Sequence, residues 1–275
     1  MIFPELYVPS CVNQKWPVTG LDSLESCLDQ AHYLSYPYQF DYQYNSRGFR
    51  DSEWPADLSN VVWCIGDSFT VGIGVPREHT WPGLLQERTG RRTINVSIDG
   101  ASNNWIAKVG SAILKQFPNA VIVTHWSFLH RGELDVNAAR EQKFQKFYMA
   151  VRDPAWPNCN SVSNIKDLPD YIQKEITQVH GWTNTIYGED RRAHYVRDTD
   201  QQDIVNTENC IHQLQGTVVH SAIPNWSPPG LPVNFKNVIL TEQLDYARDG
   251  FHYDIITSTA LVNQIIPALA LNANG

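Results

Sequence analysis

The sequence predicts an α/β fold built around a parallel sheet of about five strands. Three observations support it: an unbroken apolar run at Val61–Ile65, an alternation of strand-like and helix-like segments after that run, and clear helix boundary signals between them. A strand that is buried on both faces reads as a continuous apolar run. Strands that alternate with helices form parallel sheets covered on both faces. We therefore expect three α/β/α layers.

Each element follows from local patterning. The predicted strands span Val61–Ile65, Thr93–Ile98, Ala120–Thr124, Thr217–Ile223 and Val238–Leu240. The predicted helices after Asn104 span about Asn104–Gln116, Val136–Val151, Arg191–Leu214 and Ile255–Leu271. One further helix is predicted between Thr80 and Gly90, and its boundaries are the clearest. Thr80 can cap it, Pro82 is tolerated in its first turn and Gly90 can end it.

The chain divides into an N-terminal part and one enzyme-sized domain. Residues 1–57 are expected to pack on the core as a helix at Leu21–Leu34 and an extended arm at Tyr36–Tyr44, where aromatic residues alternate with other residues. Residues 58–275 form the α/β domain, since such domains routinely reach about 200 to 250 residues. A variable insertion is expected around residues 135–197, where prolines, asparagines and serines gather.

Composition excludes several classes of function. The formal net charge of −8 and the lack of a dense Lys/Arg run argue against nucleic-acid binding. The five cysteines are widely spaced and form no CxxC pair, so neither a disulfide framework nor a zinc site is indicated. No basic and apolar leader opens the chain, and no run approaches the roughly 18 apolar residues of a membrane span. We expect a soluble, cytoplasmic protein.

Cofactor motifs are weak. Gly72-Ile73-Gly74 lacks the third glycine of a dinucleotide fingerprint, and no phosphate-binding GxxxxGK[ST] loop is present. Nine histidines raise the question of a metal, but they form no HExxH pair. We therefore expect a mechanism that needs neither cofactor nor metal.

Two short motifs point to acyl transfer. Gly66-Asp67-Ser68-Phe69 follows the first apolar strand, and Asp249-Gly250-Phe251-His252 precedes the last helix. A serine hydroxyl is a poor nucleophile until a base takes its proton, and that base needs an acid to orient it. Ligands of α/β sheets bind at the carboxyl ends of the strands, where Ser68 lies. The sequence therefore favours a triad of Ser68, His252 and Asp249.

This ordered combination resembles the SGNH (GDSL-type) hydrolases. The likeness covers about residue 61 to the C-terminus, with a weak middle, and it implies a flavodoxin-like fold and a serine esterase. It implies Ser68 as nucleophile, His252 as base and Asp249 as its orienting acid. The backbone N–H groups of Ser68 and Gly100 would be oxyanion donors, because glycine allows close approach of substrate. Asp67, Asn103 and Trp126 are expected to contact substrate.

One element of the family pattern is missing. SGNH enzymes place an asparagine after the third strand, where its amide is a third oxyanion donor, but this chain has Thr124-His125-Trp126-Ser127 there. Loss of such a donor costs roughly 2.7 to 4 kcal/mol of transition-state stabilisation. We favour His125 or Ser127 as the replacement, with Arg131 and Asn103 or Asn104 as further candidates.

Three functions therefore remain open. The first is an esterase that acts on a small acyl group, such as an O-acetyl group on a carbohydrate. The second is an acyltransferase with the same triad, in which an alcohol replaces water. The third is a catalytically silent, glycan-binding protein, for which the missing asparagine is the best argument. Each motif also has a purely structural interpretation, since Ser68 or Asp249 can cap a helix and His125 can be a core histidine.

Overall fold

The computed structural model describes residues 6–129, 131–133, 193–195, 200–224 and 235–272. Its centre is a five-stranded sheet in the order β4-β3-β5-β8-β9, with every neighbouring pair parallel. The strands are β3 (Val62–Ile65), β4 (Thr93–Asn95), β5 (Val121–Trp126), β8 (Val218–Ala222) and β9 (Val238–Leu240). Numbered along the chain, this order is 2-1-3-4-5, the flavodoxin-like arrangement. The predicted fold class is confirmed.

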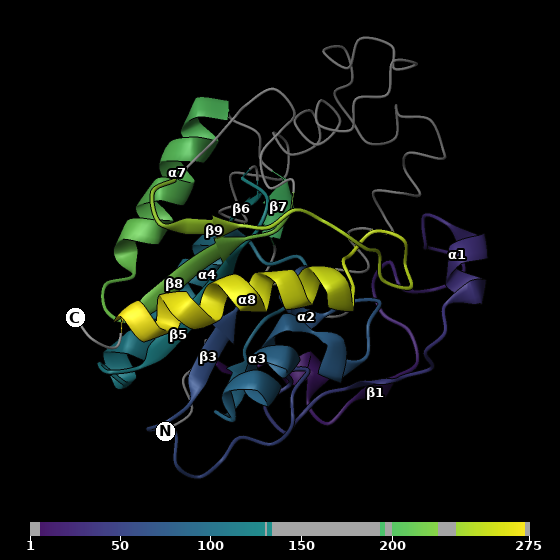
Figure 1. The fold of residues 1–275 in the computed structure, drawn as a ribbon, viewed down its shortest axis with the longest axis horizontal. Helices are drawn as coiled ribbons and strands as arrows, with labels where there is room; N and C mark the ends of the chain where they lie inside the picture. The colour runs from purple at the N-terminus through teal and green to yellow at the C-terminus, as the bar shows by residue number, and fades with distance from the viewer. Residues whose placement is uncertain (1–5, 130, 134–192, 196–199, 225–234, 273–275) are drawn as a thin grey trace.

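Helices cover both faces of this sheet. They are α2 (Ser68–Val71), α3 (Trp81–Thr89), α4 (Asn103–Gln116), α7 (Asp200–Gln213) and α8 (Ile255–Asn272), with a short 3-10 turn, η3 (Arg77–His79), before α3. Helices α3 and α8 pack against each other, as do α4 and α7. In Figure 1, α3 and α8 lie in front of the sheet and α4 lies behind it. Residues of β3 are buried on both faces, as its apolar run predicts.

The boundary signals of α3 operate as the sequence predicts. The hydroxyl of Thr80 accepts a hydrogen bond from the N–H of Gly83 at 3.2 Å, and Gly90 ends the helix with a left-handed φ of 65°. Helix α4 begins in the same way, because the hydroxyl of Ser102 accepts from the N–H of Trp105 at 3.1 Å. The cap at Thr80 ends the loop that follows α2, and the cap at Ser102 ends the loop that contains Gly100.

The N-terminal part is less helical than predicted. It contains η2 (Pro9–Cys11), β1 (Lys15–Trp16), α1 (Gln30–Ser35) and β2 (Tyr42–Gln43), and β1 pairs with β2 antiparallel. The predicted helix over residues 21–34 is found only from Gln30 onward, since residues 21–28 form turns and bends and Asp29 caps α1 through the N–H of His32. Tertiary contacts override the apolar periodicity here, because Asp22 is drawn into the interior by an ion pair.

Part of the predicted chain lies outside the described residues. The helix expected at 136–151 falls there, and so does most of the insertion around 135–197. At its two ends, β6 (Arg131–Glu133) and β7 (Ala193–Tyr195) pair antiparallel. Within the described residues, no helix combines the length and the apolar character that crossing a bilayer requires.

Candidate active site

Ser68 lies where β3 gives way to α2. Gly66 and Asp67 form the connection, and Ser68 is the first residue of the helix. Only glycine fits at position 66, because a Cβ there would lie 2.1 Å from the hydroxyl oxygen of Thr70. The carboxylate of Asp67 caps α2 by accepting from the N–H of Phe69 at 3.0 Å. The strand and the cap together hold Ser68 at the carboxyl edge of the sheet.

The structure brings the three residues of the predicted triad into contact. Nε2 of His252 lies 2.8 Å from Oγ of Ser68, and Nδ1 of His252 lies 2.5 Å from Oδ2 of Asp249. The other carboxylate oxygen of Asp249 accepts from the backbone N–H groups of Phe251 and His252, both at 3.0 Å. All three side chains are buried. The arrangement orients a base toward a serine hydroxyl, as acyl transfer requires.

Electrostatics favour a charged aspartate beside this histidine. Burial alone would lower the pKa of His252, but the charge and hydrogen bond of Asp249 outweigh it and raise that pKa above its ordinary value. Burial would likewise raise the pKa of Asp249, yet the interactions with His252 and two backbone N–H groups lower it. Asp249 therefore stabilises the imidazolium that forms when His252 takes a proton.

Two backbone N–H groups are candidates for the donors to an oxyanion. Gly100 has a left-handed φ of 71°, and a Cβ added there would meet no atom of the described residues within 4 Å. Among those residues, the space beside Gly100 is open to a reacting group. Within the described part of the chain, the N–H groups of Ser68 and Gly100 donate to no protein acceptor. Both remain available as the donors that the sequence predicts.

His125 is part of the core. It is fully buried, and burial lowers its pKa to about 3, so its ring is neutral at physiological pH. The hydroxyl of Ser221 donates to the carbonyl of Thr124 at 2.8 Å, so it accepts from Nδ1 of His125 at 2.9 Å. Nε2 then accepts from the hydroxyl of Tyr253 at 3.0 Å. Neither ring nitrogen has a hydrogen to offer an oxyanion.

Ser127 is engaged in the same way. Its hydroxyl donates to Oδ2 of Asp67 at 2.6 Å, and its N–H donates to Oδ1 of Asn103 at 2.8 Å. Since a serine hydroxyl has one hydrogen, Ser127 cannot also donate to an oxyanion in this arrangement. The expectation that His125 or Ser127 replaces the missing asparagine is therefore not met by these contacts.

The residues expected to contact substrate are also buried. Asp67 is closed off by Ser127 and its own cap. The amide of Asn103 donates to the carbonyls of Ser127 and Phe128 and to the hydroxyl of Thr207, at 3.2 to 3.4 Å. The ring of Trp126 is completely buried and stacks on His220. The contacts of Asp67, Asn103 and Trp126 hold α2, α4 and β5 together. Asn104, the other candidate oxyanion donor, is exposed.

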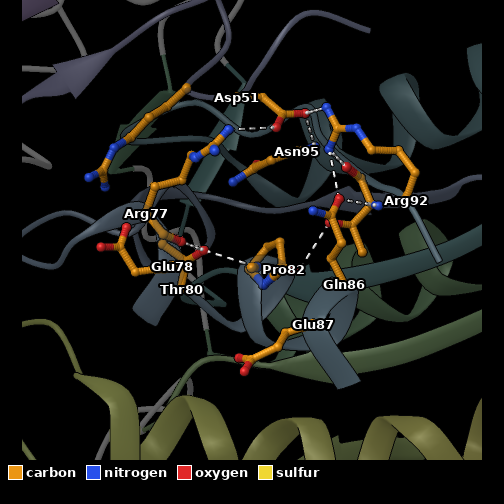
Figure 2. A pocket seen from close by; sticks show the side chains of 12 residues that line it. Asp51, Arg77, Glu78, Thr80, Pro82, Gln86, Glu87, Arg92 and Asn95 are labelled. Carbon is orange, nitrogen blue, oxygen red and sulfur yellow. Dashed lines mark hydrogen bonds and ion pairs between the residues drawn. The ribbon is translucent and has the colours of Figure 1, made fainter. Parts of the chain in front are cut away.

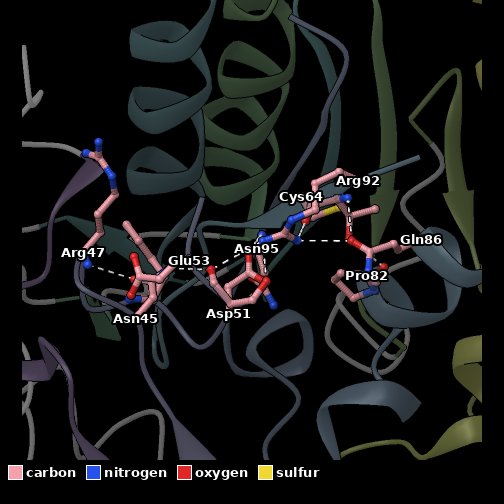
Figure 3. Close-up of polar contacts among 12 residues, drawn as sticks. Asn45, Arg47, Asp51, Glu53, Cys64, Pro82, Gln86, Arg92 and Asn95 are labelled. Atoms are coloured by element: carbon pink, nitrogen blue, oxygen red, sulfur yellow. Dashed lines mark hydrogen bonds and ion pairs between the residues drawn. The ribbon is translucent and has the colours of Figure 1, made fainter. Parts of the chain in front are cut away.

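A pocket elsewhere on the molecule is separate from this triad. It has a volume of about 250 Å³ and is lined by residues of α3 and its surroundings, none of which belongs to the triad. Figure 2 shows Arg77 and Arg92 approaching Asp51 from opposite sides of that pocket. Figure 3 shows that the carboxylate of Asp51 also accepts a hydrogen bond from the backbone N–H of Asn95. Asp51 is thus paired with two arginines, and the pocket shares no residue with the triad.

No metal site accompanies the triad in the described ranges. Three or more His, Cys, Asp or Glu side chains nowhere gather there as metal ligation would require. Sequence reasoning did miss one polar cluster, formed by Asp22, Tyr42, Gly74 and Arg248. The adjacency of Arg248 to Asp249 was the available signal, but its partner lies in the N-terminal part.

Comparison with known proteins gives only distant likeness. No protein-family model matches the chain, and no curated protein matches it. Among solved structures, one described as TesA is 14% identical, covers 76% of this chain and 97% of its own, and has a TM-score of 0.36. A psychrotrophic esterase, EstA from Pseudoalteromonas sp., is 13% identical, with coverage of 78% and 100% and a TM-score of 0.35.

A third solved structure is a carbohydrate esterase family 2 enzyme with a carbohydrate-binding domain, from Corynascus thermopiles (Myceliophthora fergusii). It is 13% identical, covers 86% of this chain and 72% of its own, and has a TM-score of 0.33. TM-scores at this level carry no weight for function. The arrangement of strands, helices and polar residues in the chain itself agrees with the fold that the SGNH resemblance implies.

Proposed function

We propose that this protein is a serine esterase of the SGNH type. One observation carries the proposal: Ser68, His252 and Asp249 form a continuous hydrogen-bonded chain at the carboxyl edge of the sheet. Serine and histidine come from segments 184 residues apart. A helix cap or a surface histidine needs no such alignment, so nucleophilic catalysis accounts best for it.

The geometry supports a two-step mechanism. His252 takes the hydroxyl proton of Ser68 through Nε2 as Oγ attacks the ester carbonyl carbon. The N–H groups of Ser68 and Gly100 then donate to the oxygen that becomes negatively charged. His252 returns its proton to the departing alcohol, which leaves an acyl group on Ser68. Water, deprotonated by the same histidine, attacks this acyl group; the bond to Oγ of Ser68 breaks, the acid leaves, and His252 returns the proton to Oγ.

We propose a small acyl group as the part of the substrate that Ser68 accepts. Phe69, which directly follows Ser68, lies among other aromatic rings. The centroid of its ring is 5.7 Å from that of Phe251 and 6.3 Å from that of Phe128. Phe128 and Phe251 are only partly buried. Apolar surface of this kind favours an acyl chain over a charged group. An O-acetyl group on a carbohydrate is the specific substrate that the family resemblance suggests.

The decisive experiment measures ester turnover and labelling together. Wild-type protein should hydrolyse p-nitrophenyl acetate and react with a fluorophosphonate at Ser68. Ser68→Ala should lose both activities, because the nucleophilic oxygen is removed. Ser258→Ala is a matched control, since Ser258 is also buried and its hydroxyl has no partner among the described residues. It should retain wild-type turnover.

The same assay separates the alternatives. Absence of both turnover and labelling in folded wild-type protein would contradict the proposal and favour a silent glycan-binding protein. An added alcohol that receives the acyl group faster than water does would identify an acyltransferase with the same triad. Labelling at a serine other than Ser68 would contradict the assignment of the nucleophile.

A further inference from the structure

A closed cycle of buried hydrogen bonds lies beside the triad. The guanidinium of Arg248 contacts both carboxylate oxygens of Asp22, with Nε at 2.8 Å and Nη2 at 2.6 Å. The hydroxyl of Tyr42 donates to Oδ2 of Asp22 at 2.5 Å and accepts from the N–H of Gly74 at 2.7 Å. The N–H of Arg248 donates to the carbonyl of Gly74 at 2.9 Å, which closes the cycle.

The cycle joins the two segments that supply the triad. Gly74 follows α2, which begins at Ser68, and Arg248 directly precedes Asp249. At Gly74 a Cβ would lie 2.7 Å from Ala247 and 3.2 Å from Oδ1 of Asp249, so the two backbones are in close contact. The cycle therefore lies between the nucleophile segment and the acid–base loop and touches both.

Burial makes the cycle rigid. Asp22 and Tyr42 are completely buried, and Arg248 is nearly so. The guanidinium of Arg248 also lies 4.2 Å over the ring of Phe40 and 5.1 Å over that of Tyr33. The two N–H···O bonds between Arg248 and Asp22 fix the relative orientation of the two side chains as well as the distance between them. Each member is held from two sides, so the loop cannot shift without breaking a buried polar contact.

The N-terminal part makes further contacts with the same loop. The N–H of Leu28 donates to the carbonyl of Asp249 at 3.2 Å, and a ring nitrogen of His32 lies 2.8 Å from the carbonyl of Ala247. The hydroxyl of Tyr36 donates to Asp254 at 2.5 Å. These three contacts and the ion pair of Asp22 with Arg248 thus converge on residues 247–254, the loop that holds Asp249 and His252.

We propose that Asp22, Tyr42 and Arg248 are positioning residues, which set the separation of Ser68 and His252 by holding residues 247–254 against Gly74. The inference rests on the proposed function of the triad and extends it to the N-terminal part. None of the three residues touches the reacting atoms. Their effect is on alignment, and a misplacement of about 1 Å can lower turnover roughly 10²-fold.

Asp22→Asn is the first test. The change keeps the shape of the side chain but leaves the guanidinium of Arg248 buried without its carboxylate. We expect kcat for p-nitrophenyl acetate to fall about 10²-fold while KM changes less than about 3-fold, because alignment rather than substrate binding is lost. The rate of fluorophosphonate labelling at Ser68 should fall by a similar factor. All rates are expressed per folded molecule.

Asp51→Asn is the matched control. Asp51 is likewise a buried aspartate paired with an arginine, Arg92 at 2.9 Å; it lines the separate pocket of Figure 2, and Figure 3 shows its polar contacts. This variant should lose stability but keep kcat within about 3-fold of wild type, because no group of the acid–base loop contacts it in the described structure. An equal loss of kcat in both variants would overturn the proposal, since the effect would then be general loosening.

Tyr42→Phe keeps the proposal testable if Asp22→Asn fails to fold. It removes one hydroxyl and retains the ion pair, so kcat should fall about 3- to 10-fold with KM unchanged. Unchanged kcat in this variant would overturn a role for the cycle.

A proton NMR signal distinguishes failure of this inference from failure of the esterase proposal. The hydrogen between His252 and Asp249 gives a low-field resonance that needs no ester. Its shift or broadening in Asp22→Asn and Tyr42→Phe, but not in Asp51→Asn, would support positioning even in a protein that turned over no ester. An unchanged resonance together with unchanged labelling in these variants would overturn the positioning role of the cycle and leave the esterase proposal standing. Absence of labelling in wild type would refute the proposed chemistry alone.

Discussion

Asp249 controls which nitrogen of His252 carries a hydrogen, and Asp249→Asn isolates that effect. Oδ1 accepts two backbone N–H groups, so an asparagine would keep its carbonyl oxygen there. Its amide NH₂ would then replace Oδ2 and face Nδ1 of His252. Nδ1 must accept that hydrogen bond, so the ring hydrogen moves to Nε2 and points at Ser68. The histidine can then no longer take the serine proton.

The size of the effect follows from this change of tautomer. Removing the corresponding carboxylate while keeping its shape lowers kcat about 10⁴-fold in a serine protease. At about 1.36 kcal/mol for each factor of ten, a loss of 10³- to 10⁴-fold here corresponds to about 4 to 5.5 kcal/mol. Substrate binding does not depend on Nε2 protonation, so KM should change little.

The assay compares Asp249→Asn with Asp254→Asn in p-nitrophenyl acetate turnover and fluorophosphonate labelling. Asp254 is a buried aspartate of the same loop that accepts from the N–H of Ile255 and the hydroxyl of Tyr36. Asparagine caps a helix as well as aspartate does and Asp249 stays intact, so turnover of this control should fall far less than that of Asp249→Asn, even with the Tyr36 contact weakened. Asp249→Asn with more than one tenth of wild-type turnover would refute the role of His252 as base.

Two further predictions concern the histidines. Because the pKa of His252 is raised and the base must be neutral, kcat/KM should fall as pH drops through a value above about 6.5, its ordinary pKa; an inflection below that value in a pH profile would contradict the reasoning. His125→Ala should lower the free energy of unfolding by about 2 to 4 kcal/mol, since two buried hydroxyl groups lose partners. Its turnover per labelled site should fall less than the roughly 10²-fold expected of an oxyanion donor, and a larger fall would reinstate His125 in the site.

Patterns local in sequence predicted the fold well. The strand Val238–Leu240 and the caps at Thr80 and Gly90 are found as predicted, and α4 begins within one residue of its expected start. These features depend on residues within a few positions of each other, or on an apolar run buried on both faces. The motif residues Ser68 and His252 could be paired because the strand order brings their loops to one edge.

Contacts between distant segments were not predictable in the same way. The periodic leucines at 21–34 suggested a helix, but the ion pair of Asp22 with Arg248 joins residues 226 positions apart and draws the chain into turns. The motif position of Trp126 gave no indication that its ring would be buried against His220. Side-chain direction at the end of a strand depends on the neighbouring strand, which one sequence does not specify.

The long separations within the site have a consequence for how the chain folds. The contact of Ser68 with His252 spans 184 residues, and the ion pair beside it spans 226. Contacts so distant in sequence form slowly, because the entropy of loop closure opposes them until most of the chain is compact. A growing chain on the ribosome cannot align Ser68 before residue 252 has emerged. Under the proposed function, the reactivity of Ser68 therefore appears only with the last stage of folding, and its recovery after denaturation measures refolding of the whole domain.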